Sequence, residues 1–239
     1  MCTILLRLDP RSDEPVLLAA NRDEFRARPA DDPAEIAPGV FGGRDRQAGG
    51  TWLAVRAGGL AALTNISGAP PRSDAPSRGE LPLAALAGRL PASFAAYNPF
   101  NLLIVDADGA RVFTHTAREE PAGPIVLGPG MHVIVNEPFA AGAGPRARHA
   151  AALLARATPG FELLVSHGPP PEHGLCHHGD AYGTVSSTVV ALDRALRVSR
   201  YLHRPGLPCS TSTVDLTSAA RAVTGAPSRR HREPSRRRS

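Results

Sequence analysis

Short apolar runs separated by turn residues dominate the start of the chain. Thr3 to Leu8 is mostly apolar and ends at Asp9-Pro10, and Val16 to Ala20 is a second apolar run. Runs bounded in this way predict the two strands of a hairpin. The end of the second strand then lies beside Cys2, and four polar residues, Asn21 to Glu24, follow it.

The same pattern recurs further along the chain. Trp52 to Arg56 and Leu60 to Thr64 flank Ala57-Gly58-Gly59, a strong hairpin signal, and the second of these strands ends in Asn65. Met131 to Val135 also ends in an asparagine, Asn136. The other predicted strands are Asn101 to Asp106, Arg111 to Thr114, Val126 to Gly128, Gly183 to Leu192 and Leu196 to His203.

Helical spacing of apolar residues is confined to three segments. Residues 81–90 follow a capping-box pair, Ser77 and Glu80, and residues 146–156 and 161–167 also favour helices. Strands outnumber helices and pair with their sequence neighbours, which predicts an α+β fold with antiparallel sheets. We expect one domain over residues 1–204 and a poorly structured C-terminal segment, 205–239, with an arginine-rich tail.

Charge is concentrated at the C-terminus. Residues 229–239 hold six arginines and one glutamate, which accounts for the whole formal net charge of +5. The neutral remainder argues against nucleic acid as a partner of the main domain. The three cysteines, Cys2, Cys176 and Cys209, do not form a disulfide framework pattern. No stretch has the length of a signal sequence or a membrane span, so we expect a cytoplasmic protein.

Cys2 is the first candidate for chemistry. Removal of Met1 would leave Cys2 with a thiol and a free α-amine, whose reference pKa values are about 8.5 and about 7.7–8.0. Such a residue can act as a nucleophile with its own base. The alternative is that Cys2 is an ordinary residue near a chain start.

The segment from Asn21 to Glu24 also has two interpretations. It is either a solvated turn or the start of a helix, or it supplies functional groups to Cys2. In the second case a carboxylate orients the amine and an arginine favours the thiolate.

A metal site is the second candidate. The segment from His173 to Asp180 contains cysteine, histidine and aspartate, which are suitable ligand types. The adjacent histidines, His177 and His178, lie in a loop rich in glycine and proline, and no second ligand pair follows at a spacing typical of zinc sites. We therefore expect no metal.

Several motifs in order carry a family resemblance. Besides Met1-Cys2 and Asn21-Arg22-Asp23-Glu24, they are Gly42-Gly43-Arg44-Asp45, Gly50-Thr51-Trp52-Leu53, Leu63-Thr64-Asn65, Ser77-Arg78-Gly79, Phe100-Asn101-Leu102, Tyr182-Gly183-Thr184 and Ser186-Ser187-Thr188. Over about residues 1–200 the chain resembles the NRDE family, also called the transport and Golgi organisation 2 family. That family looks related to N-terminal nucleophile hydrolases, which implies a four-layer αββα sandwich of two antiparallel sheets between helices.

The resemblance also implies site residues. In the related bile-salt and penicillin-V hydrolases the pattern consists of an N-terminal cysteine, a strand-end Arg-Asn-x-Asp and two later asparagines. The implied catalytic residues are Cys2, Asp23, Asn65 and Asn136, with Asp23 orienting the amine and the asparagines holding substrate or oxyanion. The implied substrate-binding residues are Asn21, Arg22 and Trp52.

Two positions depart from the patterns. The arginine of the hydrolase pattern falls on Ala20, and Arg22, two residues along, would supply the charge from the same face of the strand. Family members commonly have arginine where this chain has Val185. That arginine resembles one that lines the hydrolase site, so its replacement bears on turnover or on the choice of substrate.

Two functions follow as expectations. The first is an N-terminal nucleophile amidohydrolase that cleaves a non-peptide C–N bond of a small molecule through Cys2, without a metal or organic cofactor. The second is a non-catalytic binding or trafficking protein for haem or a lipid or acyl ligand, with the loop from His173 to His178 supplying axial haem ligands.

Overall fold

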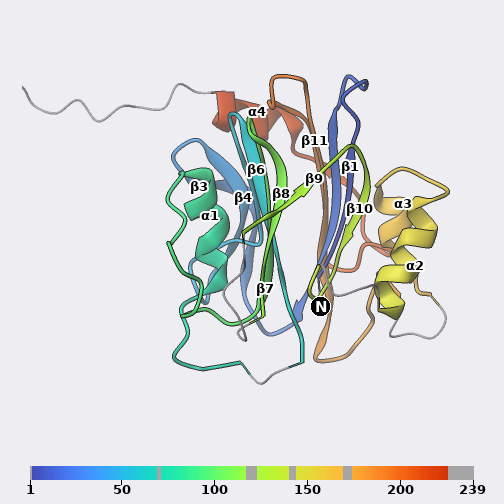
Figure 1. The fold of residues 1–239 in the computed structure, drawn as a ribbon. Coiled ribbons are helices and arrows are strands. Elements are labelled where there is room, and N and C mark those ends of the chain that lie inside the picture. Colours follow the sequence, from blue (N-terminus) through green and yellow to red (C-terminus); the bar gives the residue numbers. More distant parts are fainter. Residues whose placement is uncertain (1, 69–70, 117–122, 140–143, 169–173, 226–239) are drawn as a thin grey trace, which may run out of the picture.

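Two antiparallel sheets lie face to face in the computed structural model, which describes residues 2–68, 71–116, 123–139, 144–168 and 174–225 (Figure 1). The strands are β1 (Thr3–Leu8), β2 (Val16–Phe25), β3 (Ala30–Ala37), β4 (Val40–Asp45), β5 (Leu53–Arg56), β6 (Gly59–Asn65), β7 (Phe100–Asp106), β8 (Gly109–His115), β9 (Ile125–Leu127), β10 (Gly130–Ile134), β11 (Tyr182–Leu192), β12 (Val198–Pro205) and β13 (Val214–Asp215). One sheet has the spatial order β10-β1-β2-β11-β12-β13, and the other runs from β3 to β9 in sequence order.

Helices cover the outer faces of both sheets. A 3₁₀ turn, η1 (Arg78–Glu80), leads into α1 (Leu81–Leu86), which packs on β5, β6 and β7. On the opposite side, α2 (Pro145–Leu154) packs on β10, and α3 (Phe161–Leu164) packs on β2 and β11. Figure 1 shows these layers in the order helix, sheet, sheet, helix. The α+β sandwich expected from the sequence is confirmed.

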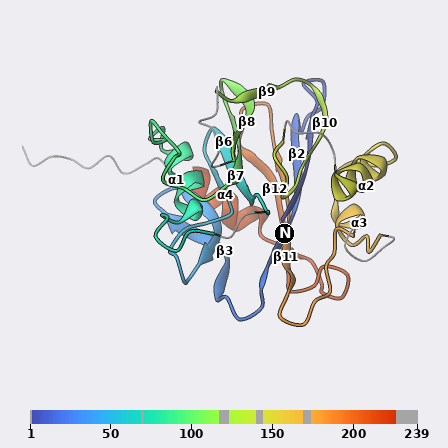
Figure 2. The same cartoon turned by 60° about the horizontal axis from the view of Figure 1, so that its bottom comes forward.

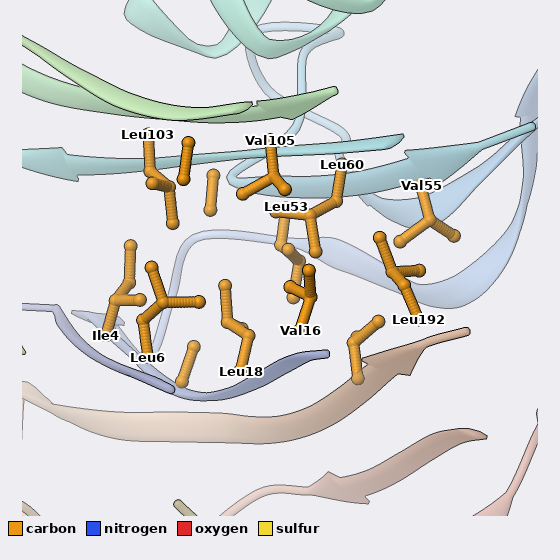
Figure 3. Close-up of a cluster of buried hydrophobic side chains, with 14 of the residues drawn as sticks. Ile4, Leu6, Val16, Leu18, Leu53, Val55, Leu60, Leu103, Val105 and Leu192 are labelled. Atoms are coloured by element: carbon orange, nitrogen blue, oxygen red, sulfur yellow. The ribbon is translucent and has the colours of Figure 1, made fainter. Parts of the chain in front are cut away.

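Alternation along the strands divides the apolar side chains between two cores. Ile4, Leu6 and Leu18 point between the sheets and meet Leu53 and Leu103 of the other sheet (Figure 3). The intervening residues Leu5, Leu17 and Ala19 point outward and pack beneath α2 and α3. Each fully buried leucine or isoleucine stabilises the fold by about 1.5–3 kcal/mol. Both faces of β1 and β2 are thus covered.

Strand register determines what surrounds the start of the chain. In the pairing of β1 with β2, Thr3 lies opposite Asn21, which confirms the predicted hairpin. β2 also pairs with β11, where Asp23 lies opposite Thr184. The register shifts between Thr184 and Ser186, so Val185 forms a bulge. The polar end of β2 therefore lies between β1 and β11, inside the sheet.

Two segments differ from what their sequences favour. A glycine pair such as Gly42-Gly43 is typical of a tight turn, yet both residues lie within β4: a Cβ at Gly42 would lie 2.4 Å from the Leu53 carbonyl oxygen, and one at Gly43 would lie 2.4 Å from the Trp52 ring. The segment beyond Pro205 is also more ordered than predicted. It contains β13, which pairs with β12, and α4 (Thr217–Gly225), whose Ala220 is fully buried.

The apolar side of α4 is formed mainly by alanine and valine, and such small side chains produce a weak pattern, which is why the sequence did not predict it. The arginine-rich tail lies outside the described residues. Among the helices of the described part, none is long and apolar enough to cross a bilayer.

Candidate functional site

The polar end of β2 presents its side chains to two sides of the sheet. Arg22 has the same parity as Ala20 and Leu18, which face the core between the sheets, so it points inward as predicted. Asn21 and Asp23 have the opposite parity and point toward the helices α2 and α3. One tetrapeptide therefore supplies the wall of an inner cavity and an outer buried network.

The inner cavity has a volume of about 430 Å³ and lies between the two sheets near the start of β1. That end of the sandwich is turned toward the viewer in Figure 2. Four of the predicted site residues line it, namely Cys2, Arg22, Trp52 and Asn65. Residues that the site prediction did not include also line it, among them Glu24, Arg28, Asp45, Ser77, Arg78 and Asn98.

The thiol of Cys2 is half-buried at the wall of this cavity. Its Sγ lies 3.8 Å from the main-chain oxygen of Asp23, a long contact through which the S–H group can donate. Burial raises the pKa of Cys2 above its ordinary value, and the negative charge of Asp23 acts in the same direction. The nearby guanidinium of Arg22 acts in the opposite direction, because it favours the thiolate.

Three arginines give the cavity its positive charge. The Arg22 guanidinium lies over the Trp52 ring, 4.3 Å from the ring centroid, and 3.9 Å from Glu24. Arg28 pairs with Asp45 at 2.5 Å. Arg78 donates from Nη1 to the Pro99 oxygen at 2.9 Å, which leaves the rest of its guanidinium beside the cavity.

Arg78 could have been found from the sequence, because it belongs to the Ser77-Arg78-Gly79 motif. Backbone contact explains part of that motif: Thr51 donates its N–H to the Gly79 oxygen at 2.8 Å. A Cβ at Gly50 would lie 2.4 Å from the Gly79 carbonyl carbon. Glycine at position 50 therefore lets the segment before β5, which carries Trp52, and the turn that carries Arg78 approach each other beside the cavity.

Asp23 lies in the outer network. Its Oδ2 accepts from Arg146 Nη2 at 2.8 Å, and its Oδ1 accepts from Thr184 Oγ1 at 2.6 Å. Arg146 also donates from Nε to Thr3 Oγ1 at 3.1 Å. Sequence reasoning missed Arg146, because an arginine near the start of an ordinary predicted helix carries no signal. The prediction that the Asp23 carboxylate orients the Cys2 amine stays a prediction.

Asn21 holds the framework together. Its Nδ2 donates to the main-chain oxygens of Leu164 at 3.0 Å and Leu175 at 2.7 Å, and Ser187 Oγ donates to its Oδ1. The side chain is almost fully buried and does not line the cavity. Because faces alternate along β2, Asn21 points away from the cavity that Arg22 lines, and its assignment to substrate binding stays a prediction.

The two later asparagines come together from different sheets. Asn136 Nδ2 donates to the Asn65 main-chain oxygen at 2.6 Å, and Ser67 donates its N–H to the Asn136 oxygen at 3.0 Å. Asn65 is half-buried and lines the cavity. Asn136 is only 6% exposed and lies behind it. Asn65 therefore contacts the cavity itself, whereas Asn136 reaches it only through its hydrogen bond to Asn65.

Val185, where family members commonly have arginine, does not line the cavity beside Cys2. With Arg22, Trp52 and His203 it lines a second cavity of about 260 Å³. Arg22 and Trp52 thus contribute to both cavities, and the bulge directs Val185 to the second one.

Metal-binding side-chain types gather at a third place. His167, Cys176, His178 and Cys209 converge beyond the outer face of the six-stranded sheet. The side chain of His177 is not part of this group, and His173 lies outside the described residues.

Comparison with known proteins places the chain among relatives. The sequence profile described as "Transport and Golgi organisation 2" matches residues 1–160. The chain is 35% identical over 159 residues to the "Transport and Golgi organization 2 homolog" of Mus musculus, and 33% identical over 158 residues to the homologue of Bos taurus. Each match covers 57% of this chain and 57% of the relative, so the chain spans just over half the length of these relatives.

Proposed function

The chain belongs to the transport and Golgi organisation 2 family, and we propose that it is an amide hydrolase whose nucleophile is the thiol of Cys2. The family assignment supports the position of the site, because Cys2, Arg22, Trp52 and Asn65 all fall within the matched residues. The proposed substrate is a small, linear, non-peptide amide, and the proposed cavity is the one between the two sheets.

One observation carries the proposal. The Cys2 thiol opens into a cavity in which two largely buried guanidinium groups lie within electrostatic reach. Burial lowers the pKa of Arg22 and of Arg78, and the negative charge of a Cys2 thiolate acts on both in the opposite direction. By the same coupling the two arginines stabilise the thiolate, the form in which cysteine attacks a carbonyl carbon.

The reaction would run in two steps. After removal of Met1, the α-amine of Cys2 takes the thiol proton while Sγ adds to the amide carbonyl carbon. The C–N bond then breaks, the amine leaves with that proton, and a thioester remains on Cys2. Water adds to the thioester with the α-amine again as base, which releases the carboxylic acid and restores the thiol.

The cavity also suggests a substrate class. Arg28 is paired with Asp45, whereas Arg78 forms no ion pair among the residues that the structure describes. A guanidinium in this setting suits a carboxylate or another anionic group on the substrate. Trp52, stacked under Arg22, offers an apolar surface to the rest of the acyl chain. We therefore favour amides of acyl groups that bear a negative charge.

The test combines mass spectrometry with turnover. Intact mass of the purified full chain should show loss of Met1, and a limiting dose of iodoacetamide should modify Cys2 first. A library of N-acyl amides, with and without a carboxylate on the acyl group, is then screened for released amine. Cys2→Ala should lower kcat on the order of 10³-fold or more.

Two controls separate chemistry from folding. Arg46→Gln, which changes a side chain that is 63% exposed and does not line the cavity, should keep both the labelling of Cys2 and the turnover. Retention of Met1, or turnover by Cys2→Ala equal to that of the unmodified protein, would rule out the mechanism. The protein would then be considered as a binding protein that uses the same cavity.

A further inference from the structure

Four side chains from three separate segments point at one another beyond the outer face of the six-stranded sheet. His167 follows α3, Cys176 and His178 belong to the segment before β11, and Cys209 follows β12. One ligand atom from each lies within 4.8 Å of the others. The imidazole and thiol groups are the side chains that bind zinc most often in structural sites.

Four of the six distances among the ligand atoms are close to those around a tetrahedral ion, and the other two, from His167 to the two sulfurs, are within 4.8 Å. Zinc bonds of about 2.3 Å to sulfur and about 2.0–2.1 Å to nitrogen hold two sulfurs about 3.8 Å apart, a sulfur and a nitrogen about 3.5 Å apart, and two nitrogens about 3.3 Å apart. The two Sγ atoms of Cys176 and Cys209 are 3.7 Å apart. His178 Nε2 lies 3.4 Å and 3.2 Å from these two sulfurs. His167 Nε2 lies 3.1 Å from His178 Nε2.

The main chain holds these groups in place. Leu175 and Cys176 donate their N–H groups to the Ser166 oxygen at 2.8 and 3.0 Å, which joins the two histidine-bearing segments. The main chain of His177, between the two ligands, is held by Thr184: its N–H donates to Thr184 Oγ1 at 2.8 Å, and its carbonyl oxygen accepts from the Thr184 N–H at 2.9 Å. Cys176 is itself only 2% exposed. Next to Cys209, Ser210 donates its N–H to the Leu207 oxygen at 3.1 Å. The four ligands therefore come from hydrogen-bonded segments and not from one loop.

We propose that His167, Cys176, His178 and Cys209 bind one Zn²⁺ ion in a closed Cys₂His₂ site. Two sulfur and two nitrogen ligands in a tetrahedron are typical of zinc. On binding, the two thiols lose their protons to solvent, and the two thiolates balance the charge of the ion. Four protein ligands leave no position for substrate, so the role of the ion is structural.

The site would brace the network behind Cys2. Leu175, next to the ligand Cys176, accepts hydrogen bonds from Asn21 Nδ2 at 2.7 Å and from Arg146 Nη2 at 3.3 Å. Arg146 in turn pairs with Asp23. Zinc would therefore fix the loop that supports the polar end of β2. This inference does not depend on the proposed hydrolase activity.

The experiment measures metal in the full chain, purified under reducing conditions without chelator. Elemental analysis should find about one zinc per chain. After zinc removal, a titration with Co²⁺ alone should produce the visible bands of tetrahedral cobalt and a thiolate-to-metal charge-transfer band. Removal of the metal should lower the Tm, because the ion binds the folded state.

Matched variants locate the site. Cys209→Ser and His178→Asn should each lower zinc content about tenfold or more, whereas His177→Asn and Cys2→Ala should keep it. The Co²⁺ spectrum of the unmodified chain tests the proposal even if a ligand variant fails to fold. Absence of both zinc and the Co²⁺ bands would overturn it, and so would equal zinc in Cys209→Ser. A Cys176–Cys209 disulfide, seen as a chain two hydrogens lighter, would also overturn it.

Discussion

Two regions of the molecule hold its three cysteines, and the groups around the sulfur differ. Cys2 lies at the wall of a polar cavity, within electrostatic reach of the guanidinium groups of Arg22 and Arg78. Cys176 and Cys209 lie against each other and against the imidazole of His178. A guanidinium group favours a reactive thiolate but has no acceptor atom with which to bind a metal ion, whereas an imidazole nitrogen can be a metal ligand.

The difference shows that the neighbours of a cysteine decide its chemistry. The two regions are nevertheless connected, because the network of Asp23, Arg146 and Leu175 lies between them. A substitution can therefore act on one region alone or on the connection. The following experiments separate these cases.

The largest effect is expected at the connection. Asp23→Asn leaves the Arg146 guanidinium buried without its ionic partner; the two side chains are 0% and 6% exposed. Loss of one member of such a pair costs about 3–5 kcal/mol of unfolding free energy. Urea unfolding followed by Trp52 fluorescence measures it. Elemental analysis of the same variant should show a smaller zinc content, because Arg146, one of the two donors to the Leu175 oxygen, is no longer held by the Asp23 carboxylate.

The matched control is Glu14→Gln, which breaks a partly exposed pair with Arg200. Loss of this Glu14–Arg200 pair should lower the unfolding free energy by less than about 1 kcal/mol. If Asp23→Asn is no more destabilising than Glu14→Gln, the network does not connect the two regions.

An intermediate effect is expected at the two asparagines of the Cys2 region. Asn136→Ala removes the buried donor to the Asn65 oxygen, which should lower the unfolding free energy by about 1–3 kcal/mol. Asn65→Ala removes only a half-buried side chain of the cavity wall, so we expect little change in stability and a lower kcat. Thermal unfolding and turnover, measured on both variants, test this. If Asn136→Ala and Asn65→Ala lowered the unfolding free energy equally, Asn136 would not be the framework residue and Asn65 only a residue of the cavity wall.

The smallest effect concerns the charge beside Cys2. Because burial raises the pKa of Cys2, the thiolate is the minor form at neutral pH, and the rate of labelling by iodoacetamide should rise with pH until the pH reaches that pKa. Arg22→Gln removes a charge that lowers the pKa, so labelling of Cys2 at fixed pH should slow about three- to tenfold.

Arg46 provides the control for this experiment, because its side chain is 63% exposed and does not line the cavity. Arg46→Gln should leave the labelling rate of Cys2 unchanged. Labelling of Cys176 and Cys209 should not respond to either substitution. An equal response of all three cysteines to Arg22→Gln would mean that the variant loosens the whole fold.

Much of the scaffold could be predicted from the sequence because its signals are local. Apolar runs bounded by turn residues identified β1 and β2, and the alternation of side chains along a strand placed Arg22 on the face of Ala20. Turn glycines identified the hairpin of β5 and β6. The family motifs then identified the polar end of β2 and the turn that carries Arg78.

Other parts of the site could not be predicted in this way. The sequence did not show that the Asn21 side chain is tied into the framework on the outer face, because the residues whose oxygens it binds, Leu164 and Leu175, are more than 140 positions away. It also missed Arg146, whose importance comes only from its partner Asp23. Burial and pairing of polar groups depend on what packs against them, and a linear pattern does not contain that.

The three cysteines illustrate the same division. The sequence by itself determined the sheets, the strand that follows Cys2 and the family to which the chain belongs, because strand periodicity and motif spacing are properties of neighbouring residues. Only the tertiary structure brought Cys209 and His167 to Cys176 and His178. Their positions follow from how α3 and the strands β11 and β12 pack, since ligands from separate segments meet only after the chain has folded.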